Sequence, residues 1–142
     1  MDFLDPDIVK AFDNSDSAVR YWAAMGVLMR EEKAVKKTRL TLLKALLDDS
    51  PSVRVIAAQA LGQYGGDGDA VKALDVLLEL ADVNKNSVFV AMLAINGLDA
   101  MGGRAAGVKG RIAGLPKKAK RDTPRVGNYV GNLLRKVLAD LD

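Results

Sequence analysis

The sequence of 142 residues contains no cysteine and no histidine, and only 5% of its residues are aromatic. Without cysteine there is no disulfide framework and no thiol nucleophile, and without histidine the serine–histidine triads and His/Cys metal sites are excluded. The few aromatic residues favour closely packed helices over a β-sandwich, which uses more aromatic and β-branched side chains. Carboxylate pairs remain as possible catalytic groups, but most acidic residues stand where helix caps and turns are expected.

The chain also lacks an uninterrupted apolar run of the ~18 residues that a membrane-spanning helix needs. The segment 1–6 has neither the basic start nor the apolar stretch of a signal peptide. We therefore expect one folded domain over residues 1–142 that makes no membrane contact and needs no cofactor or metal. The compartment is left open by these features.

A repeat with an offset of 34 residues organises the first half of the chain. When segment 15–24 is laid over segment 49–58, both contain Val-Arg-x-x-Ala-Ala, so that Arg20 falls on Arg54 and Trp22 on Ile56. A third copy follows at an offset of 37 residues, and a degenerate fourth copy follows it. The expected units are approximately 5–30, 34–65, 68–102 and 104–141.

Each unit has the pattern of two amphipathic helices, with apolar residues three and four positions apart. Three pairs predict an N-cap followed by proline at the first helical position: Asp5-Pro6, Ser50-Pro51 and Thr123-Pro124. Two glycine pairs predict helix ends with positive φ: Gly65-Gly66 and Gly102-Gly103. The expected helices are 6–14, 17–30, 34–48, 51–64, 69–82, 87–101, 104–114 and 124–140.

Small residues recur at matched positions in the second helix of each unit. Gly26, Ala60 and Gly97 form one column, and Ala23, Ala57 and Ala94 form another. Glycine inside a helix costs about 1 kcal/mol relative to alanine, so its use there indicates a closely approaching neighbour. We therefore expect an all-α superhelix of about four helical pairs, in which adjacent units cover each other's apolar faces.

The two-helix unit with Asp/Ser-x-x-Val-Arg-x-x-Ala-Ala, seen at 16–24 and 50–58, resembles the HEAT-repeat family. More narrowly, 19–24, 53–58 and 88–99 are similar to the HEAT region at the C-terminus of many bacterial sulfatases. The sulfatase catalytic motif, Cys/Ser-x-Pro/Ala-x-Arg, does not occur in this chain, so the resemblance does not carry the activity over. It implies a non-catalytic accessory segment, periplasmic or secreted if it belongs to a sulfatase and otherwise cytoplasmic.

The repeated arginines, Arg20 and Arg54, allow two interpretations. They form either a basic row for an acidic partner or structural ties to neighbouring aspartates and carbonyls, and we favour the ties, the usual role of this arginine in HEAT proteins. Trp22 is expected to be buried because it aligns with the core position Ile56, which leaves Tyr21 as the better contact residue. The partner-binding candidates are Tyr21, Gln59, Gln63, Asn96 and Asp99.

Two glycine-rich segments resemble ligand-binding motifs incompletely. The segment 65–69 matches part of the calcium repeat Gly-Gly-x-Gly-x-Asp but occurs once, so we interpret it as a turn. The segment 102–109 approaches a phosphate loop, but it lacks the preceding strand, the Gly-Lys junction and the following Ser or Thr. We reject the phosphate-loop interpretation.

The segment 104–125 carries eight basic residues against one acidic residue, Asp122. Such a run is either a solvated surface or an attractor for nucleic acid, acidic glycan or an acidic protein face. It contains no aromatic residue that could stack on a base, which favours the solvated surface. The basic residues are Arg104, Lys109, Arg111, Lys117, Lys118, Lys120, Arg121 and Arg125.

The sequence thus predicts a non-catalytic module for binding or bracing another protein, including the catalytic domain of a parent protein. Binding of nucleic acid or another polyanion through 104–125 is the alternative function.

Overall fold

The computed structural model describes residues 6–117 and 124–142, and for residues 124–128 the backbone alone. The described residues form helices and turns with no β-strand. The elements are α1 (Pro6–Ala11), α2 (Ser17–Met29), α3 (Glu31–Lys37), α4 (Arg39–Ala45), α5 (Pro51–Tyr64), α6 (Asp67–Leu80), α7 (Val88–Met101), the 3-10 helix η1 (Gly102–Val108), α8 (Lys109–Ala113) and α9 (Pro124–Asp140). The all-α architecture is therefore as the repeat predicts.

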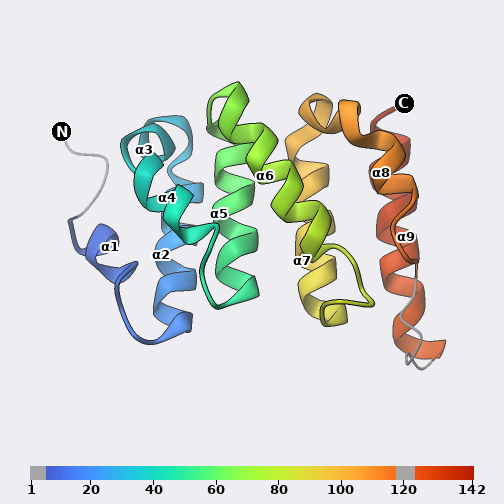
Figure 1. The fold of residues 1–142 in the computed structure, drawn as a ribbon, viewed down its shortest axis with the longest axis horizontal. Helices are drawn as coiled ribbons and strands as arrows, with labels where there is room; N and C mark the ends of the chain where they lie inside the picture. The colour runs from blue at the N-terminus through green and yellow to red at the C-terminus, as the bar shows by residue number, and fades with distance from the viewer. Residues whose placement is uncertain (1–5, 118–123) are drawn as a thin grey trace.

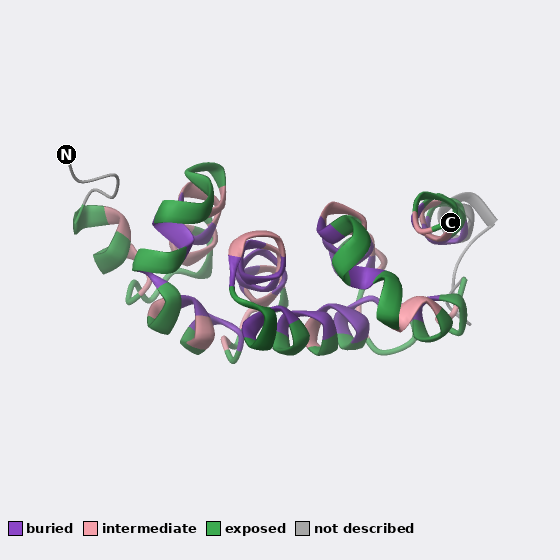
Figure 2. Ribbon diagram, turned by 90° about the horizontal axis from the view of Figure 1, so that it is seen from above, coloured by how far each residue is buried: buried purple, intermediate pink, exposed green. Residues whose placement is uncertain are grey.

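The helices form two layers that follow one another along the long axis of the molecule. In Figure 1, α2, α5, α7 and α9 stand side by side, and α4, α6 and α8 lie in front of them. Seen from above, in Figure 2, the four parallel helices form a shallow arc, and α6 lies on its outer side. Each helix of the arc packs against the next, α2 on α5, α5 on α7 and α7 on α9, so the units succeed one another by translation. We call the inner side of this arc the concave face.

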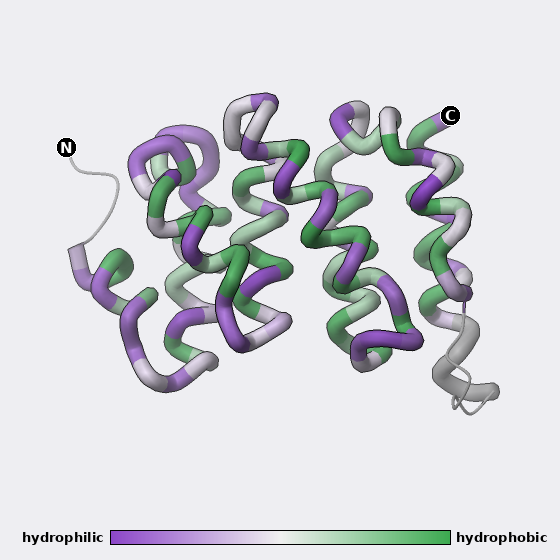
Figure 3. The backbone as a smooth tube through the Cα atoms, viewed as in Figure 1, coloured by the Kyte–Doolittle hydropathy of each residue, from purple (hydrophilic) through white to green (hydrophobic). Residues whose placement is uncertain are grey.

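Within a helix, apolar and polar residues alternate at helical spacing, as the changing colours along α6 in Figure 3 show. The apolar side of α6 supplies Ala73, Leu74, Leu77 and Leu78 to a core that continues through the described units. Because one helix pair cannot enclose such a stripe, burial is completed only by the neighbouring pair.

The expected helix 34–48 is wrong as a single element, because the chain divides into α3 and α4 at Thr38. The buried Thr38 hydroxyl donates to the carbonyl of Ala34 at 2.7 Å, and its backbone leaves the helical region at φ −105° and ψ 20°. A threonine that bonds back to the preceding turn competes with the regular helix and bends it. The expected helix 104–114 is also interrupted, because η1 precedes α8 and the two together, 102–113, contain four glycines.

Helix ends agree with the sequence at some positions only. Pro51 is the first residue of α5, but the side chain of Ser50 makes no capping bond. Asp16, one of the acidic residues expected at caps and turns, accepts from Ala18 N–H, and a cap that was not anticipated occurs at Ser87, which accepts from Val90 N–H. Asp5 and Thr123 lie outside the described residues.

The prediction of positive φ is confirmed for Gly102, at 57°, and wrong for Gly65 and Gly66, at −81° and −66°. A Cβ on Gly65 would lie 2.5 Å from the carbonyl oxygen of Leu61, so close backbone approach is what requires glycine there. Glu31 is the one described non-glycine residue with positive φ, 65°, and it lets α3 follow α2 without a loop.

The small-residue columns lie at helix contacts. Ala23, Ala57 and Ala94 are buried, and a Cβ on Gly97 would stand 3.0 Å from Leu77 Cδ2. A tighter contact that the alignment did not single out is at Gly62, where a Cβ would lie 2.6 Å from Met101 Sδ. The approach at Gly62 brings α5 close to α7, and the approach at Gly97 brings α7 close to α6.

Candidate interaction surfaces

The concave face contains a small pocket that spans three of its helices. It has a volume of about 320 Å³ and is lined by Tyr21 and Phe89 together with the small residues Ser17, Ala18, Ser50 and Ser52. Phe89, on the first turn of α7, and Tyr21, on α2, contribute its two aromatic rings. None of the lining residues carries a charge, so the pocket suits an uncharged side chain.

The two neighbouring aromatic residues of α2 exchange the roles that the alignment predicts. Trp22 is 68% exposed, whereas Tyr21 is half-buried and packs against the core. Their rings meet edge to face, with centroids 5.9 Å apart at an interplanar angle of 81°. The expected burial of Trp22 is wrong because its counterpart Ile56 has the preceding helix α2 beside it, whereas among the described residues α2 is preceded only by the short α1.

The amide candidates lie on the side of their helices that the core leaves uncovered. Gln59 and Gln63 are half-buried, and Gln59 Nε2 donates to Gln63 Oε1 at 3.2 Å. Asn96, at the position of α7 that matches Gln59, is exposed. Their role in partner binding stays a prediction, but all three are placed to contact a ligand of the concave face.

Asp99 is already engaged within the chain. Its Oδ2 accepts from Lys136 Nζ of α9 at 2.5 Å, and Lys136 also reaches Asp140 at 3.4 Å. The hydrogen bond from Lys136 holds the pKa of the Asp99 carboxyl below its ordinary range, although partial burial opposes this shift. The side chain therefore ties α7 to α9 and has less freedom than Asn96 to receive a partner.

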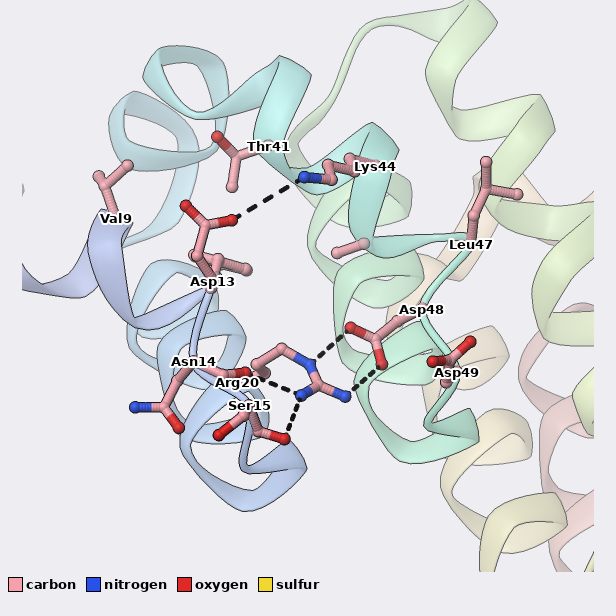
Figure 4. A pocket seen from close by; sticks show the side chains of 12 residues that line it. Val9, Asp13, Asn14, Ser15, Arg20, Thr41, Lys44, Leu47, Asp48 and Asp49 are labelled. Atoms are coloured by element: carbon pink, nitrogen blue, oxygen red, sulfur yellow. Dashed lines mark hydrogen bonds and ion pairs between the residues drawn. The ribbon is translucent and has the colours of Figure 1, made fainter.

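Arg20 links the first two units at the base of a groove, shown in Figure 4. Its Nε and Nη2 donate to the two carboxylate oxygens of Asp48 at 2.9 and 3.0 Å. Its Nη1 donates to the carbonyls of Asn14 and Ser15 at 2.9 and 3.1 Å. Together the four bonds use all three guanidinium nitrogens, which fixes the turn before α2 against the turn before α5.

Burial of Asp48 opposes its ionisation, but hydrogen bonds from Arg20 and Ser50 N–H and the attraction of Arg20 together lower its pKa. The groove around this pair has a volume of about 750 Å³. Its rim mixes Asp13, Lys44 and Asp49 with the exposed Leu47, and Lys44 comes within 3.9 Å of Asp13. The charges of this rim are mixed, so it gives no strong preference for an anion or a cation.

Arg54 repeats the pattern one unit later with fewer bonds. Its Nε donates to the Leu46 carbonyl at 2.8 Å, and its Nη2 lies 3.3 Å from Glu79 Oε2. A further tie that the repeat did not predict joins Arg39 to the buried Asp69, with Nε–Oδ2 and Nη2–Oδ1 distances of 2.6 and 3.0 Å. The hydrogen bond from Arg39 lowers the pKa of Asp69 against the effect of burial. The sequence pattern does not show this pair, because Arg39 and Asp69, in the first turn of α6, are not at matched repeat positions.

A family model described as HEAT repeats matches residues 6–106, which include the stacked helix pairs α1 to α7. The chain belongs to the HEAT-repeat family. No curated protein matches the chain. HEAT repeats typically mediate protein–protein interaction or scaffolding, and the family is generally non-catalytic. The match ends before α8 and α9, the pair that we describe as the degenerate fourth unit.

In this HEAT-repeat chain the described part of the basic segment is largely neutralised. Arg104 donates to the Gly62 carbonyl at 2.8 Å and approaches Asp67 at 3.4 Å, Lys109 pairs with Asp142, and Arg111 pairs with Asp75 at 3.0 Å. Lys117 is exposed. Lys118, Lys120, Arg121 and the side chain of Arg125 lie outside the described residues.

The continuous helical stretch Val88–Ala113 is long and apolar enough to cross a membrane by length and composition. In this HEAT-repeat fold its apolar residues have another use, because Val90, Ala94, Leu98 and Met101 are buried in the core between α5, α6 and α9.

The carboxylates of the glycine-rich segment 65–69 lie in the first turn of α6 and pair with arginines of the same chain. Asp69 pairs with Arg39 and Asp67 approaches Arg104. Within residues 6–117 and 124–142, no group of three carboxylates is placed to hold a metal ion.

Proposed function

We propose that this HEAT-repeat chain binds another protein on its concave face and that the pocket between Tyr21 and Phe89 receives an uncharged side chain of that partner. The observation that carries the proposal is the exposure of Phe89 beside a pocket that three helices build jointly. A large apolar side chain held on a packed helix is a typical anchor of a protein interface.

The surroundings of the pocket support a protein ligand. Gln59, Gln63 and Asn96 add donors and acceptors along the same face, which can bond to a partner's backbone. The strongest described ion pairs, Arg20–Asp48 and Arg39–Asp69, are satisfied within the chain, so the face does not depend on strong charge attraction. Binding there is expected to change little with salt, unlike the binding of a polyanion.

Selection from a displayed peptide library on the immobilised chain tests this proposal. The selected peptides should share an uncharged apolar residue, and Phe89→Asp should weaken their binding at least about tenfold, or ~1.4 kcal/mol. Leu47→Asp is the matched control, because Leu47 is also exposed but lies in the groove beside Arg20. Peptides that bind the Phe89→Asp variant as tightly as the unaltered chain would contradict the proposal.

A more specific form of this proposal is that the partner is a sulfatase-type catalytic domain, which this chain braces. The similarity of 19–24, 53–58 and 88–99 to sulfatase HEAT regions motivates it. Titration of such a domain into the chain, with Phe89→Asp as the variant, would measure association directly. Absence of any association at micromolar concentration would remove this version and leave the general proposal standing.

A further inference from the structure

The pocket between Tyr21 and Phe89 lies across the first turns of three parallel helices, at positions that match in the repeat. Ala18 of α2, Ser52 of α5 and Phe89 of α7 are each the second residue of their helix, and all three line the pocket. Alanine and serine are much smaller than phenylalanine, so this row is filled at α7 and open at α2 and α5. The pocket has a volume of about 320 Å³, whereas a cavity of about 150 Å³ is enough to bind benzene. It therefore has room for a whole aromatic side chain.

Ser50 departs from the capping pattern of the array. Asp16, Ser50 and Ser87 are the N-cap residues of α2, α5 and α7, at matched positions of the repeat and all with extended backbone. Asp16 accepts from Ala18 N–H and Ser87 accepts from Val90 N–H, but the side chain of Ser50 makes no capping bond. An N-cap side chain normally stabilises its helix, and α5 lacks this contribution. Of the three cap residues, Ser50 is the one that lines the pocket.

The serine hydroxyls of the pocket are available to a ligand. They belong to Ser17, Ser50 and Ser52, and none of them makes a hydrogen bond to another residue within 6–117 and 124–142. Ser17 is exposed, and the other two are half-buried. A ligand that displaces water from such hydroxyls loses affinity unless it replaces the hydrogen bonds of that water. Because a serine hydroxyl both donates and accepts, the best replacement is a group that also does both.

We propose that the uncharged side chain received by this pocket is a tyrosine of the partner protein. This inference rests on the proposed function and names the residue that the pocket selects. Tyrosine combines a ring, which packs against the rings of Tyr21 and Phe89, with a hydroxyl that donates and accepts. Phenylalanine and leucine carry no polar group, tryptophan can only donate, and the amide side chains of asparagine and glutamine have no ring.

The exposure of the serines sets the size of the preference. One net hydrogen bond between neutral groups corresponds to an affinity ratio of about three- to tenfold. Rejection by factors on the order of 10⁴ requires polar groups that are left buried and unpaired by the wrong ligand. Ser17 is exposed and Ser50 and Ser52 are only half-buried, so water can return to them beside a phenylalanine. We therefore expect tyrosine to bind about three- to tenfold more tightly than phenylalanine.

Titration of the full chain with N-acetyl-tyrosine amide and N-acetyl-phenylalanine amide tests this inference. Binding is followed by NMR at the amide signals of Ser52 and Phe89, up to about 10 mM, because ligands of this size bind in the millimolar range. The tyrosine probe should bind about three- to tenfold more tightly. With Ser50→Ala and Ser52→Ala combined, the two probes should bind equally, and the phenylalanine probe should keep its affinity. Ser15→Ala, a control in the groove beside Arg20, should retain the preference.

Urea denaturation of two single variants separates the pocket from the helix cap. Ser50→Ala should leave the midpoint unchanged, because its hydroxyl makes no capping bond, whereas Ser87→Ala should lower the midpoint, because Ser87 caps α7. An equal loss for the two variants would assign the Ser50 hydroxyl to the end of α5 and overturn the inference.

Three further results would overturn the inference and leave the proposed function standing. They are equal affinity of the two probes for the unaltered chain, a preference for tyrosine that survives the loss of both hydroxyls, and tighter binding of a phosphotyrosine probe, which would show that the pocket selects an anion. The proposed function fails in a different way. Phe89→Asp that binds both probes as tightly as the unaltered chain, or a lack of NMR shifts with either probe, would contradict the pocket itself and this inference with it.

Discussion

The two ends of the helix array differ in which side chains their terminal helices expose to solvent. At the C-terminal end, α9 buries Val130, Leu134 and Val137 and faces solvent with polar residues. At the N-terminal end, the described part of the chain before α2 is only the six-residue α1, and Trp22 and Met29 are exposed. The difference teaches that a repeat position has no fixed burial: the neighbouring unit decides whether the same register is core or surface.

The largest expected effect is a difference in the free energy of unfolding between a variant at the C-terminal end and one at the N-terminal end. Leu134→Ala should lower the free energy of unfolding by about 2–5 kcal/mol, because it leaves a cavity under α9. Trp22→Ser should change it by no more than about 0.5 kcal/mol in dilute solution, because the indole is exposed. Urea denaturation followed by circular dichroism measures both. Equal losses for the two variants would show that the ends are not different.

Making the polar outer side of α9 apolar should reduce the difference between the two ends. With Asn132→Leu and Arg135→Leu combined, two exposed positions of α9 become apolar, and copies of the chain should associate through them. Light scattering should show masses above that of the unaltered chain, and these masses should rise with concentration. A variant that scatters like the unaltered chain at every concentration would argue against a role of the polar outer side in limiting association.

Acid should weaken the ion pairs that join neighbouring units at each end, Asp48–Arg20 and Asp99–Lys136, and the effect should be larger for Asp48–Arg20. The pKa values of Asp48 and Asp99 lie below their ordinary value of 3.8 in the folded chain. Their contribution to stability is therefore complete above the unfolded value and is lost as the pH falls through the folded one, below about pH 4.

Asp48→Asn should therefore reduce the dependence of stability on pH in that range more than Asp99→Asn, because the Asp48–Arg20 pair is less exposed than the Asp99–Lys136 pair. Unfolding by urea at pH 2 to 5 gives the comparison. A larger change with Asp99→Asn would reverse this ranking.

The smallest effect is expected at the exposed ion pairs near α8. Arg111 and Asp75 are both more than half exposed, so Arg111→Ala should alter the free energy of unfolding by at most about 0.5 kcal/mol. The same urea experiment in low and high salt checks this value. A loss of several kcal/mol would show that the basic segment has a structural role that its exposure does not suggest.

Sequence periodicity predicted the all-α stack and the small-residue columns because both depend on local register. It failed for Trp22, because Ile56 is buried by a neighbouring helix that Trp22 lacks, and the alignment does not show this difference. It also missed the break at Thr38 and the contact of Gly62 with Met101, because each depends on a bond or approach absent from the repeat pattern. Of the candidate surface, the polar positions were predictable from spacing, whereas the pocket between Tyr21 and Phe89 requires three helices to be placed in space.

The position of α5 in the middle of the stack has a consequence for motion. It packs against α2, α4, α6 and α7, and most of its residues are buried, whereas α1 buries none. Local opening begins where few neighbours must separate, so the amide protons of α1 exchange with solvent first and those at the centre of α5 last. A ligand bound between Tyr21 and Phe89 would contact both α2 and α7, on either side of the slowly exchanging α5. Such a ligand should slow amide exchange at the N-terminal end and leave the exchange of α5 unchanged.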